Sequence, residues 1–195
     1  MFTGSNVLFG AALGNVVRGV PLTHEGTFHL TFFTHFRTDG AVGLLDWYTL
    51  SMVPFCVLML TAHGATYLTM RTEGVVHHRA KRITRVLWLA TIPMFASISL
   101  LTGLLQPELL RGLVFRPIAW VPLSVTVVSV WALVSGLRRC HERRAFLGSI
   151  FLLFGLLTTG ATVLFPVLLF STMDAADQLT AFDCAAPSNL RIAAL

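Results

Sequence analysis

Long apolar runs alternate with short polar segments along the chain, and four of the runs are long enough to span a membrane. They cover residues 44–70, 84–106, 118–137 and 145–171. Each reaches the roughly 20 residues that an α-helix needs to cross a hydrocarbon core of about 30 Å. A shorter run near the start, residues 7–20, predicts only a partial helix. The pattern predicts an all-α fold: one polytopic membrane helix bundle over residues 1–195, with four full transmembrane helices plus a partial N-terminal one.

The charged residues between the runs give this bundle an orientation. Most of the 14 basic residues lie in two connections, residues 71–85 and 138–144. The opposite connections hold most of the nine acidic residues. Cytoplasmic loops of membrane proteins carry an excess of Lys and Arg. We therefore predict that the two basic connections are cytoplasmic, and that the loop at 22–43 and the tail at 172–195 are external.

Composition agrees with a membrane protein and excludes other classes. The chain is 55% hydrophobic and 12% charged, whereas a soluble domain carries about a quarter charged residues. The mean hydropathy is +0.75. These values exclude an ordinary soluble enzyme and a disordered chain. The net charge of +5 could indicate a nucleic-acid partner. Most of the basic residues lie in two short loops, however, and membrane topology explains this position better. We therefore expect the chain to contact the lipid bilayer and no nucleic acid.

Prolines and small residues predict that the helices pack together. Each predicted span contains one proline, namely Pro54, Pro93, Pro122 and Pro166. A proline inside a helix leaves a carbonyl group that neighbouring helices, hydroxyls or water must satisfy. Gly10 and Gly14 form a GxxxG motif, and Gly155, Gly160 and Ala161 line the last span. Such small residues allow close approach of helix backbones in lipid.

Two ionisable residues, Asp46 and His63, lie inside the predicted spans. An unpaired charge inside a membrane is costly, so both are candidate functional residues. Asp46 is at the external end of its span, next to the aromatic Trp47 and Tyr48. We interpret it first as a helix-start carboxylate favoured by the helix dipole. A role in a proton path is the weaker alternative.

His63 has three interpretations. The first is packing or a hydrogen bond to a neighbouring helix. The second is a proton relay, and the third is ligation of a haem b. A buried haem is commonly held by two axial side chains, and no second histidine or methionine is evident at a matched depth.

The remaining cysteines and histidines do not form a recognisable site. Cys56, Cys140 and Cys184 fall at three different depths of the predicted topology, so we expect unpaired thiols. The external histidines 24, 29 and 35 have no metal-ligand spacing, and we expect no metal site there. Because the spans hold so few polar groups, a small multi-span permease is a further but weaker hypothesis.

Three segments resemble subunit II of the bacterial cytochrome bd-type quinol oxidases, including the cyanide-insensitive branch. Residues 14–21 read GNVVRGVP, similar to a motif at the external end of that subunit's fourth helix. Residues 63–74 read HGATYLTMRTEG, similar to its fifth helix where it enters the cytoplasmic loop. Residues 165–180 contain FP, STMD and LT, like the external end of its eighth helix. The matched motif positions are Gly14, Asn15, Gly19, Pro21, His63, Gly64, Arg71, Glu73 and Gly74.

The resemblance implies a function that the residues alone do not. It implies a heterodimer of the bacterial inner membrane that oxidises quinol and reduces dioxygen. In this family, haems b and d belong to the partner, subunit I, while subunit II binds no haem and stabilises the assembly; quinone is a further candidate ligand. The expectation is therefore a non-catalytic subunit, inactive alone, with no catalytic, cofactor-binding or metal-binding residue.

The chain also departs from the family pattern. It resembles only the C-terminal half of subunit II, beginning inside the fourth helix and ending where the ninth starts. We therefore expect a truncated gene product or half of a split gene. Acidic residues of the family's proton path have no counterpart here, and Asp46 stands where a small residue is expected. His63 occupies a family position where glutamine also occurs, which favours packing.

Overall fold

The computed structural model describes residues 2–19, 46–169 and 179–180. These ranges contain six helices: α1 (Phe2–Arg18), α2 (Trp47–Arg71), α3 (Gly74–Leu105), α4 (Pro107–Phe115), α5 (Pro117–Arg139) and α6 (Glu142–Leu164). Two short strands, β1 (Val167–Leu169) and β2 (Leu179–Thr180), pair in antiparallel fashion. Four of the helices, α2, α3, α5 and α6, are long and apolar enough to cross a membrane. This confirms the all-α, polytopic membrane class, to which the strands add only one small pair.

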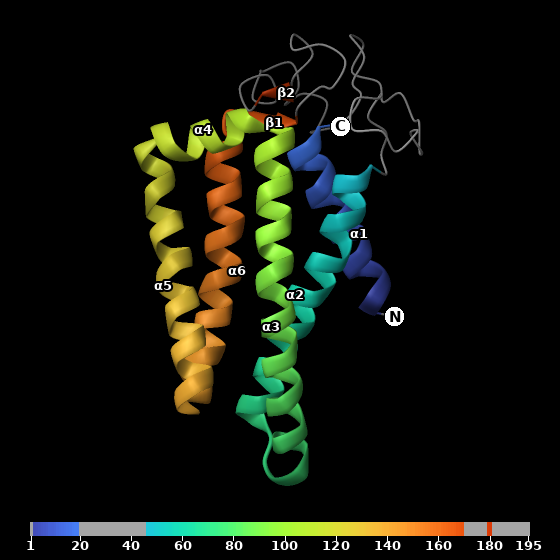
Figure 1. Cartoon of the computed structure of the whole chain (residues 1–195), viewed down its shortest axis with the longest axis vertical. Coiled ribbons are helices and arrows are strands. Elements are labelled where there is room, and N and C mark those ends of the chain that lie inside the picture. The colour runs from blue at the N-terminus through green and yellow to red at the C-terminus, as the bar shows by residue number, and fades with distance from the viewer. Residues whose placement is uncertain (1, 20–45, 170–178, 181–195) are drawn as a thin grey trace, which may run out of the picture.

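The long helices stand side by side, and the two basic connections lie at the same end of the bundle (Figure 1). The α2–α3 and α5–α6 connections are at the bottom of that view, whereas α4, β1 and β2 are at the top. We call the first the basic end and the second the opposite end. Arg18 and Asp46, at the end of α1 and the start of α2, lie toward the opposite end.

The helix bounds differ from the predicted runs where the local sequence overrides hydropathy. Helix α1 begins at Phe2 and ends at Arg18 instead of covering residues 7–20, and its end is set by Gly19, whose φ of 92° leaves the helical region. Helix α3 begins at Gly74, since Arg, Lys and Ala in the basic connection are good helix formers. Its 32 residues correspond to about 48 Å, so its basic start projects beyond a hydrocarbon core of about 30 Å.

The last run, residues 145–171, is not one continuous helix. Helix α6 ends at Leu164, and β1 follows two residues later. Proline disfavours helical backbone in the residue before it, and Phe165 accordingly lies outside the helical region, with φ −54° and ψ 136°. Pro166 therefore lies beyond the helix, whereas Pro54, Pro93 and Pro122 lie inside α2, α3 and α5.

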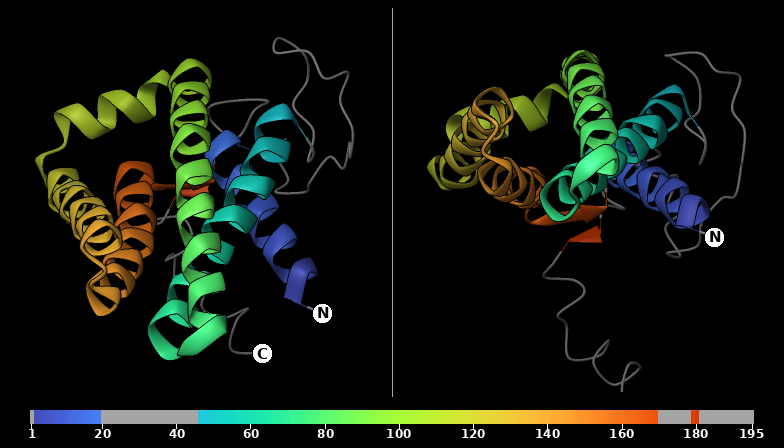
Figure 2. Two further views of the ribbon diagram at one scale, coloured as in Figure 1. Left: turned by 60° about the horizontal axis from the view of Figure 1, so that its bottom comes forward. Right: turned by 90° about the horizontal axis from the view of Figure 1, so that it is seen from below.

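Helix α4 lies in the connection between the predicted runs 84–106 and 118–137, where no helix was predicted. It has Pro107 at its start and Glu108 in its first turn, two features that favour a helix N-terminus. Its nine residues run across the opposite end of the bundle between α3 and α5 (Figure 2).

Glycines bring helix backbones into contact at two interfaces, as the small-residue pattern predicted. A Cβ on Gly10 would lie 2.8 Å from Val53 Cα, and one on Gly14 would lie 2.9 Å from Thr49 Cα, so α1 packs closely on α2. Between α5 and α6, a Cβ on the predicted Gly155 would lie 3.1 Å from the Thr126 nitrogen, and one on Gly148, which the pattern did not include, would lie 2.6 Å from the Leu133 nitrogen. Gly160 does not belong to this interface, because a Cβ there would meet open space.

Candidate functional site

A buried ion pair joins the end of α1 to the start of α2. Arg18 Nε donates a hydrogen bond to Asp46 Oδ2 over 2.9 Å, and the two side chains are 9% and 6% exposed. Arg18 is the last residue of α1 and Asp46 is the N-cap of α2. A cation at a helix C-terminus and an anion at a helix N-terminus are both favoured by the helix dipoles. The two helix ends therefore support the charges that hold them together.

Further side-chain hydrogen bonds surround this ion pair. Thr49 Oγ1 donates to Asn15 Oδ1 over 3.1 Å, and Gln106 Nε2 donates to the backbone oxygen of Arg18 over 3.2 Å. The hydroxyls of Tyr48 and Thr102 lie 2.8 Å apart. We call this set the Arg18–Asp46 layer; it links α1, α2 and α3 through Asn15, Arg18, Asp46, Tyr48, Thr49, Thr102 and Gln106.

The motif at residues 14–21 explains how this layer forms. Gly14 allows α1 to approach Thr49, and Asn15 then accepts the Thr49 hydrogen bond. Gly19 has a φ of 92°, a left-handed conformation that favours glycine, and its amide donates to the Asn15 carbonyl over 2.8 Å. The helix thus stops directly after Arg18. Pro21 lies outside the described residues.

Asp46 stands at the helix start, as its first interpretation proposed, but its side chain does not cap the helix. The carboxylate makes no hydrogen bond to the first turn of α2, and its partner is Arg18 instead. The sequence reasoning named Asp46 without finding this partner. The signal that could have revealed it is a basic residue ending one apolar helix and an acidic residue starting the next, because both must lie at the same membrane surface.

His63 links α2 to α6. Its Nδ1 lies 2.8 Å from Ser149 Oγ, and its ring stacks on Phe146 with 5.4 Å between ring centroids. The single Ser149 hydroxyl proton is donated to the Phe146 carbonyl, so His63 Nδ1 must donate to Ser149 Oγ. Ser149 is fully buried. Gly64, the neighbouring motif residue, is exposed, and a Cβ there would meet open space.

Hydroxyl groups tie α2 to α3, a feature that hydropathy could not reveal. Trp88 Nε1 donates to Thr66 Oγ1 over 3.0 Å, and the hydroxyls of Thr69 and Thr84 lie 3.1 Å apart. Thr66 and Thr84 are fully buried. The spacing of Thr66 and Thr69 was a usable signal, because residues three apart share one face of a helix.

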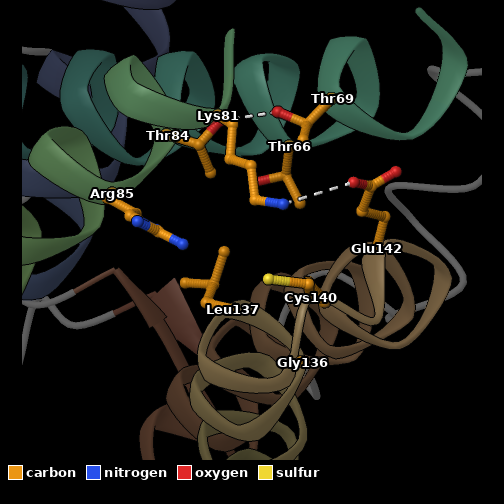
Figure 3. A pocket seen from close by; sticks show the side chains of 10 residues that line it. Thr66, Thr69, Lys81, Thr84, Arg85, Gly136, Leu137, Cys140 and Glu142 are labelled. Carbon is orange, nitrogen blue, oxygen red and sulfur yellow. Dashed lines mark hydrogen bonds and ion pairs between the residues drawn. The ribbon is translucent and has the colours of Figure 1, made fainter. Parts of the chain in front are cut away.

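At the basic end, Glu142 of α6 lies close to two basic side chains of α3. Its Oε1 lies 3.1 Å from His77 Nε2 and 3.8 Å from Lys81 Nζ, and all three side chains are partly exposed. Figure 3 shows Lys81 extending toward Glu142, beside the Thr69–Thr84 contact.

The motif residues Arg71, Glu73 and Gly74 form the α2–α3 connection at this end. Arg71 is the exposed last residue of α2, and Glu73 is the N-cap of α3. Gly74 has a φ of 65°, a left-handed conformation that favours glycine.

The other sequence candidates do not converge on a site. Cys56 is buried and Cys140 exposed, both as free thiols, while Cys184 and histidines 24, 29 and 35 lie outside the described residues. Across the described ranges, no group of three or more His, Cys, Asp or Glu side chains could hold a metal ion.

Comparison with known proteins gives one family. A model of the family "Cytochrome bd terminal oxidase subunit II" matches residues 3–194. The chain belongs to this family.

Two curated relatives agree with this assignment. A "Probable cytochrome oxidase subunit 2" of Haemophilus influenzae is 27% identical over 216 residues, covering 94% of this chain and 54% of that protein. The "Cytochrome bd-I ubiquinol oxidase subunit 2" of Escherichia coli K12 is 34% identical over 99 residues, covering 49% of this chain and 25% of that protein. The chain thus spans about half the length of the first relative.

The family and the four spanning helices together make this a multi-pass inner-membrane protein. The subunit II resemblance predicted from the three sequence segments is confirmed. The family name also identifies the complex to which such subunits belong, a terminal oxidase.

Proposed function

We propose that this subunit II chain is a membrane scaffold of a bd-type quinol:oxygen oxidoreductase, and that it supports a haem-bearing subunit I without carrying redox chemistry itself. The observation that carries the proposal is that the polar groups inside the membrane-spanning region bind neighbouring helices of the same chain. Arg18 with Asp46, and His63 with Ser149, each join two helices. In the described part of the chain, no buried side-chain nitrogen or oxygen lacks a hydrogen-bond partner.

Helix α2 is the centre of this scaffold. It is bonded to α1 through Asp46 and Thr49, to α3 through Thr66 and Thr69, and to α6 through His63. Hydrogen bonds between membrane helices contribute about 0.6 kcal/mol each on average, and buried charge pairs respond more strongly when broken. A helix tied on three sides suits a subunit whose role is to hold a fixed shape.

The outer surface suits hydrocarbon or an apolar protein partner. Large apolar side chains face outward on α1, α3 and α5; examples are Leu8 at 73%, Leu89 at 72% and Trp131 at 64% exposed. On this proposal, haems b and d and the quinol-oxidising site belong to subunit I, and the described helices supply the surface against which that subunit is stabilised.

The alternatives are weaker on the same geometry. Asp46 is buried and paired with Arg18, so a proton path through it would have to break the ion pair. His63 is oriented by Ser149 and stacked on Phe146, which favours a link between α2 and α6 over haem b ligation. A permease would need polar groups facing a midplane path, whereas the buried polar groups described above face neighbouring helices.

Co-purification tests the proposal. The tagged 195-residue chain is co-expressed with the subunit I from the same genome, and the purified material is analysed by protein composition and absorption spectrum. We expect a haem-bearing partner in the complex and no Soret band from the tagged chain alone. Absence of a haem-bearing partner would contradict the scaffold.

The variant His63→Ala separates the scaffold from the haem hypothesis. We expect the spectrum of the complex to keep its haem bands in this variant. A Soret band from the chain alone that disappears in His63→Ala would instead establish haem binding by this subunit.

A further inference from the structure

A lipid-facing cavity lies between α3 and α5. Its volume is about 470 Å³, within the range of roughly 300–1,000 Å³ typical of ligand sites. Its walls are apolar side chains of α3 and α5, and its floor is formed by Met59 of α2 and Leu152 and Leu156 of α6. The walls include Trp88, Ile92 and Phe95 on one side and Val130 and Val134 on the other.

Helix α4 accounts for this cavity. It lies across the opposite end of the bundle and separates the end of α3 from the start of α5 (Figure 2). Its nine residues are about 14 Å long, more than the 8–10 Å between the axes of packed helices. Helices α3 and α5 are therefore held too far apart to close on each other, and each packs mainly on its own partner, α2 or α6.

Two arginines line the basic end of the same cavity. Arg85 belongs to α3 and Arg138 to α5, and both are exposed. Within the described ranges, neither guanidinium has a carboxylate in ion-pair distance, whereas nearby Lys81 is paired with Glu142. Figure 3 shows Arg85 extending past Thr84 toward Leu137, apart from the Lys81–Glu142 pair.

The depth of these arginines matches a lipid headgroup. From Leu105 at the end of α3 back to Arg85, the helix rises about 30 Å, the thickness of a hydrocarbon core. From Pro117 at the start of α5 to Arg138, the rise is about 32 Å. Both cations thus lie where the hydrocarbon ends, on the side that the basic connections assign to the cytoplasm.

We propose that this cavity binds an anionic glycerophospholipid of the cytoplasmic leaflet. An acyl chain occupies the apolar groove, and the phosphate and anionic headgroup lie between Arg85 and Arg138. Basic pockets between membrane helices on the cytoplasmic side are suited to anionic lipid headgroups. A zwitterionic lipid would bring its own cation beside the two arginines, and an uncharged quinone would leave both without a counter-charge.

Lipid binding to the purified full-length chain tests this site. The chain is delipidated in mild detergent and titrated with phosphatidylglycerol or with phosphatidylcholine of the same acyl chains, and bound lipids are counted by native mass spectrometry. We expect one phosphatidylglycerol to bind at least tenfold more tightly than phosphatidylcholine. Replacing both arginines, Arg85→Gln with Arg138→Gln, is expected to weaken phosphatidylglycerol binding about ten- to thirtyfold.

Matched variants distinguish this site from general surface charge. The pair Arg82→Gln with Arg139→Gln removes two exposed arginines of the same helices that do not line the cavity, and affinity should stay within about twofold. The pair Arg85→Lys with Arg138→Lys should retain most of the preference. Filling the groove with Val130→Phe and Val134→Phe should weaken the binding of both lipids, although the charge of the site is unchanged.

Three results would overturn the proposal. They are equal affinity for the two lipids, an equal loss in the Arg82 and Arg139 control pair, or recovery of a quinone instead of a phospholipid from the chain purified from its native membrane. Each variant is first shown to be monodisperse, so that lost binding is not lost folding.

Discussion

Each end of the bundle contains a pair of one acidic and one basic side chain, but the pair is buried at one end and partly exposed at the other. At the α1–α2 junction, Arg18 and Asp46 are 2.9 Å apart with side chains 9% and 6% exposed. At the basic end, His77 Nε2 lies 3.1 Å from Glu142 Oε1, with side chains 18% and 29% exposed. Breaking a buried pair costs about 3–5 kcal/mol, whereas an exposed pair contributes up to about 1 kcal/mol.

This difference follows the connectivity of the chain. At the basic end, two-residue connections join α2 to α3 and α5 to α6, so each of these helix pairs is held together covalently there, and the Glu142 contacts only add a link between α6 and α3. Residues 19–46 separate α1 from α2, and the close contact of these helices must come from side chains. The buried ion pair and the glycine contacts of α1 supply it. The largest effects of mutation are therefore expected at the opposite end.

Replacing Asp46 is expected to have the largest effect. The variant Asp46→Ala leaves Arg18 buried without a counter-charge and should lower the free energy of unfolding by about 3–5 kcal/mol. Unfolding in mixed detergent and SDS micelles measures this loss. The matched control is Glu108→Ala, which breaks an exposed pair with Arg111 and should change stability by less than about 1 kcal/mol. Equal losses in the two variants would remove the contrast between a buried and an exposed ion pair.

Two glycines of α6 test whether close helix packing stabilises the bundle in addition to its ion pair and side-chain hydrogen bonds. In Gly148→Ala the new Cβ would meet the Leu133 backbone nitrogen at 2.6 Å, and we expect a loss of about 1–3 kcal/mol. In Gly160→Ala the Cβ meets open space, and stability should rise by up to about 1 kcal/mol through better helix propensity. The same unfolding assay compares them; a stabilising Gly148→Ala would contradict the packing account.

The hydrogen bond between α2 and α6 should contribute less to the free energy of unfolding than the Arg18–Asp46 pair or the close packing at Gly148. Ser149→Ala removes the acceptor of His63 Nδ1 and should cost about 0.6 kcal/mol, and at most about 1.7 kcal/mol. Ser124→Ala is the control, because that hydroxyl bonds only to a backbone carbonyl of its own helix, Val121. If the two serine variants are equally stable, His63 does not tie these helices together.

The smallest effect is expected at the basic end. Glu142→Gln removes the negative charge that faces His77 and Lys81 and should cost up to about 1 kcal/mol. Because the side chains are partly exposed, salt should reduce this difference, whereas the Asp46→Ala difference should persist in salt. Unfolding at low and high ionic strength compares the two. If the loss of stability in Glu142→Gln did not depend on salt, the ion pair at the basic end would be as well shielded from solvent as the Arg18–Asp46 pair.

Most of the fold was predictable because hydropathy reports on lipid exposure directly. The four spanning helices follow from their apolar runs, and the close contacts of Gly10 and Gly14 follow from their spacing. The helix ends were less predictable, since Pro166 ends α6 early and good helix formers extend α3 into a charged connection. Hydropathy averages over a window and does not register such local preferences.

The site was only half predictable. Asp46 and His63 stand out as ionisable residues in apolar runs, but their partners Arg18 and Ser149 are distant in sequence. Thr66 and Thr84 gave no hydropathy signal at all, because a hydroxyl that bonds to a neighbouring side chain or carbonyl is tolerated in lipid. Pairings of this kind depend on which helices are adjacent, and hydropathy and motif spacing do not specify that.

A double-mutant cycle at Arg18 and Asp46 tests most directly the claim that a buried ion pair fixes α1 on α2. The unfolding free energies of wild type, Arg18→Ala, Asp46→Ala and the double variant are measured under one set of conditions. We expect the double variant to be more stable than the sum of the two single losses implies, with a coupling energy of about 2–3 kcal/mol. Single losses that simply add, with a coupling energy near zero, would contradict the account.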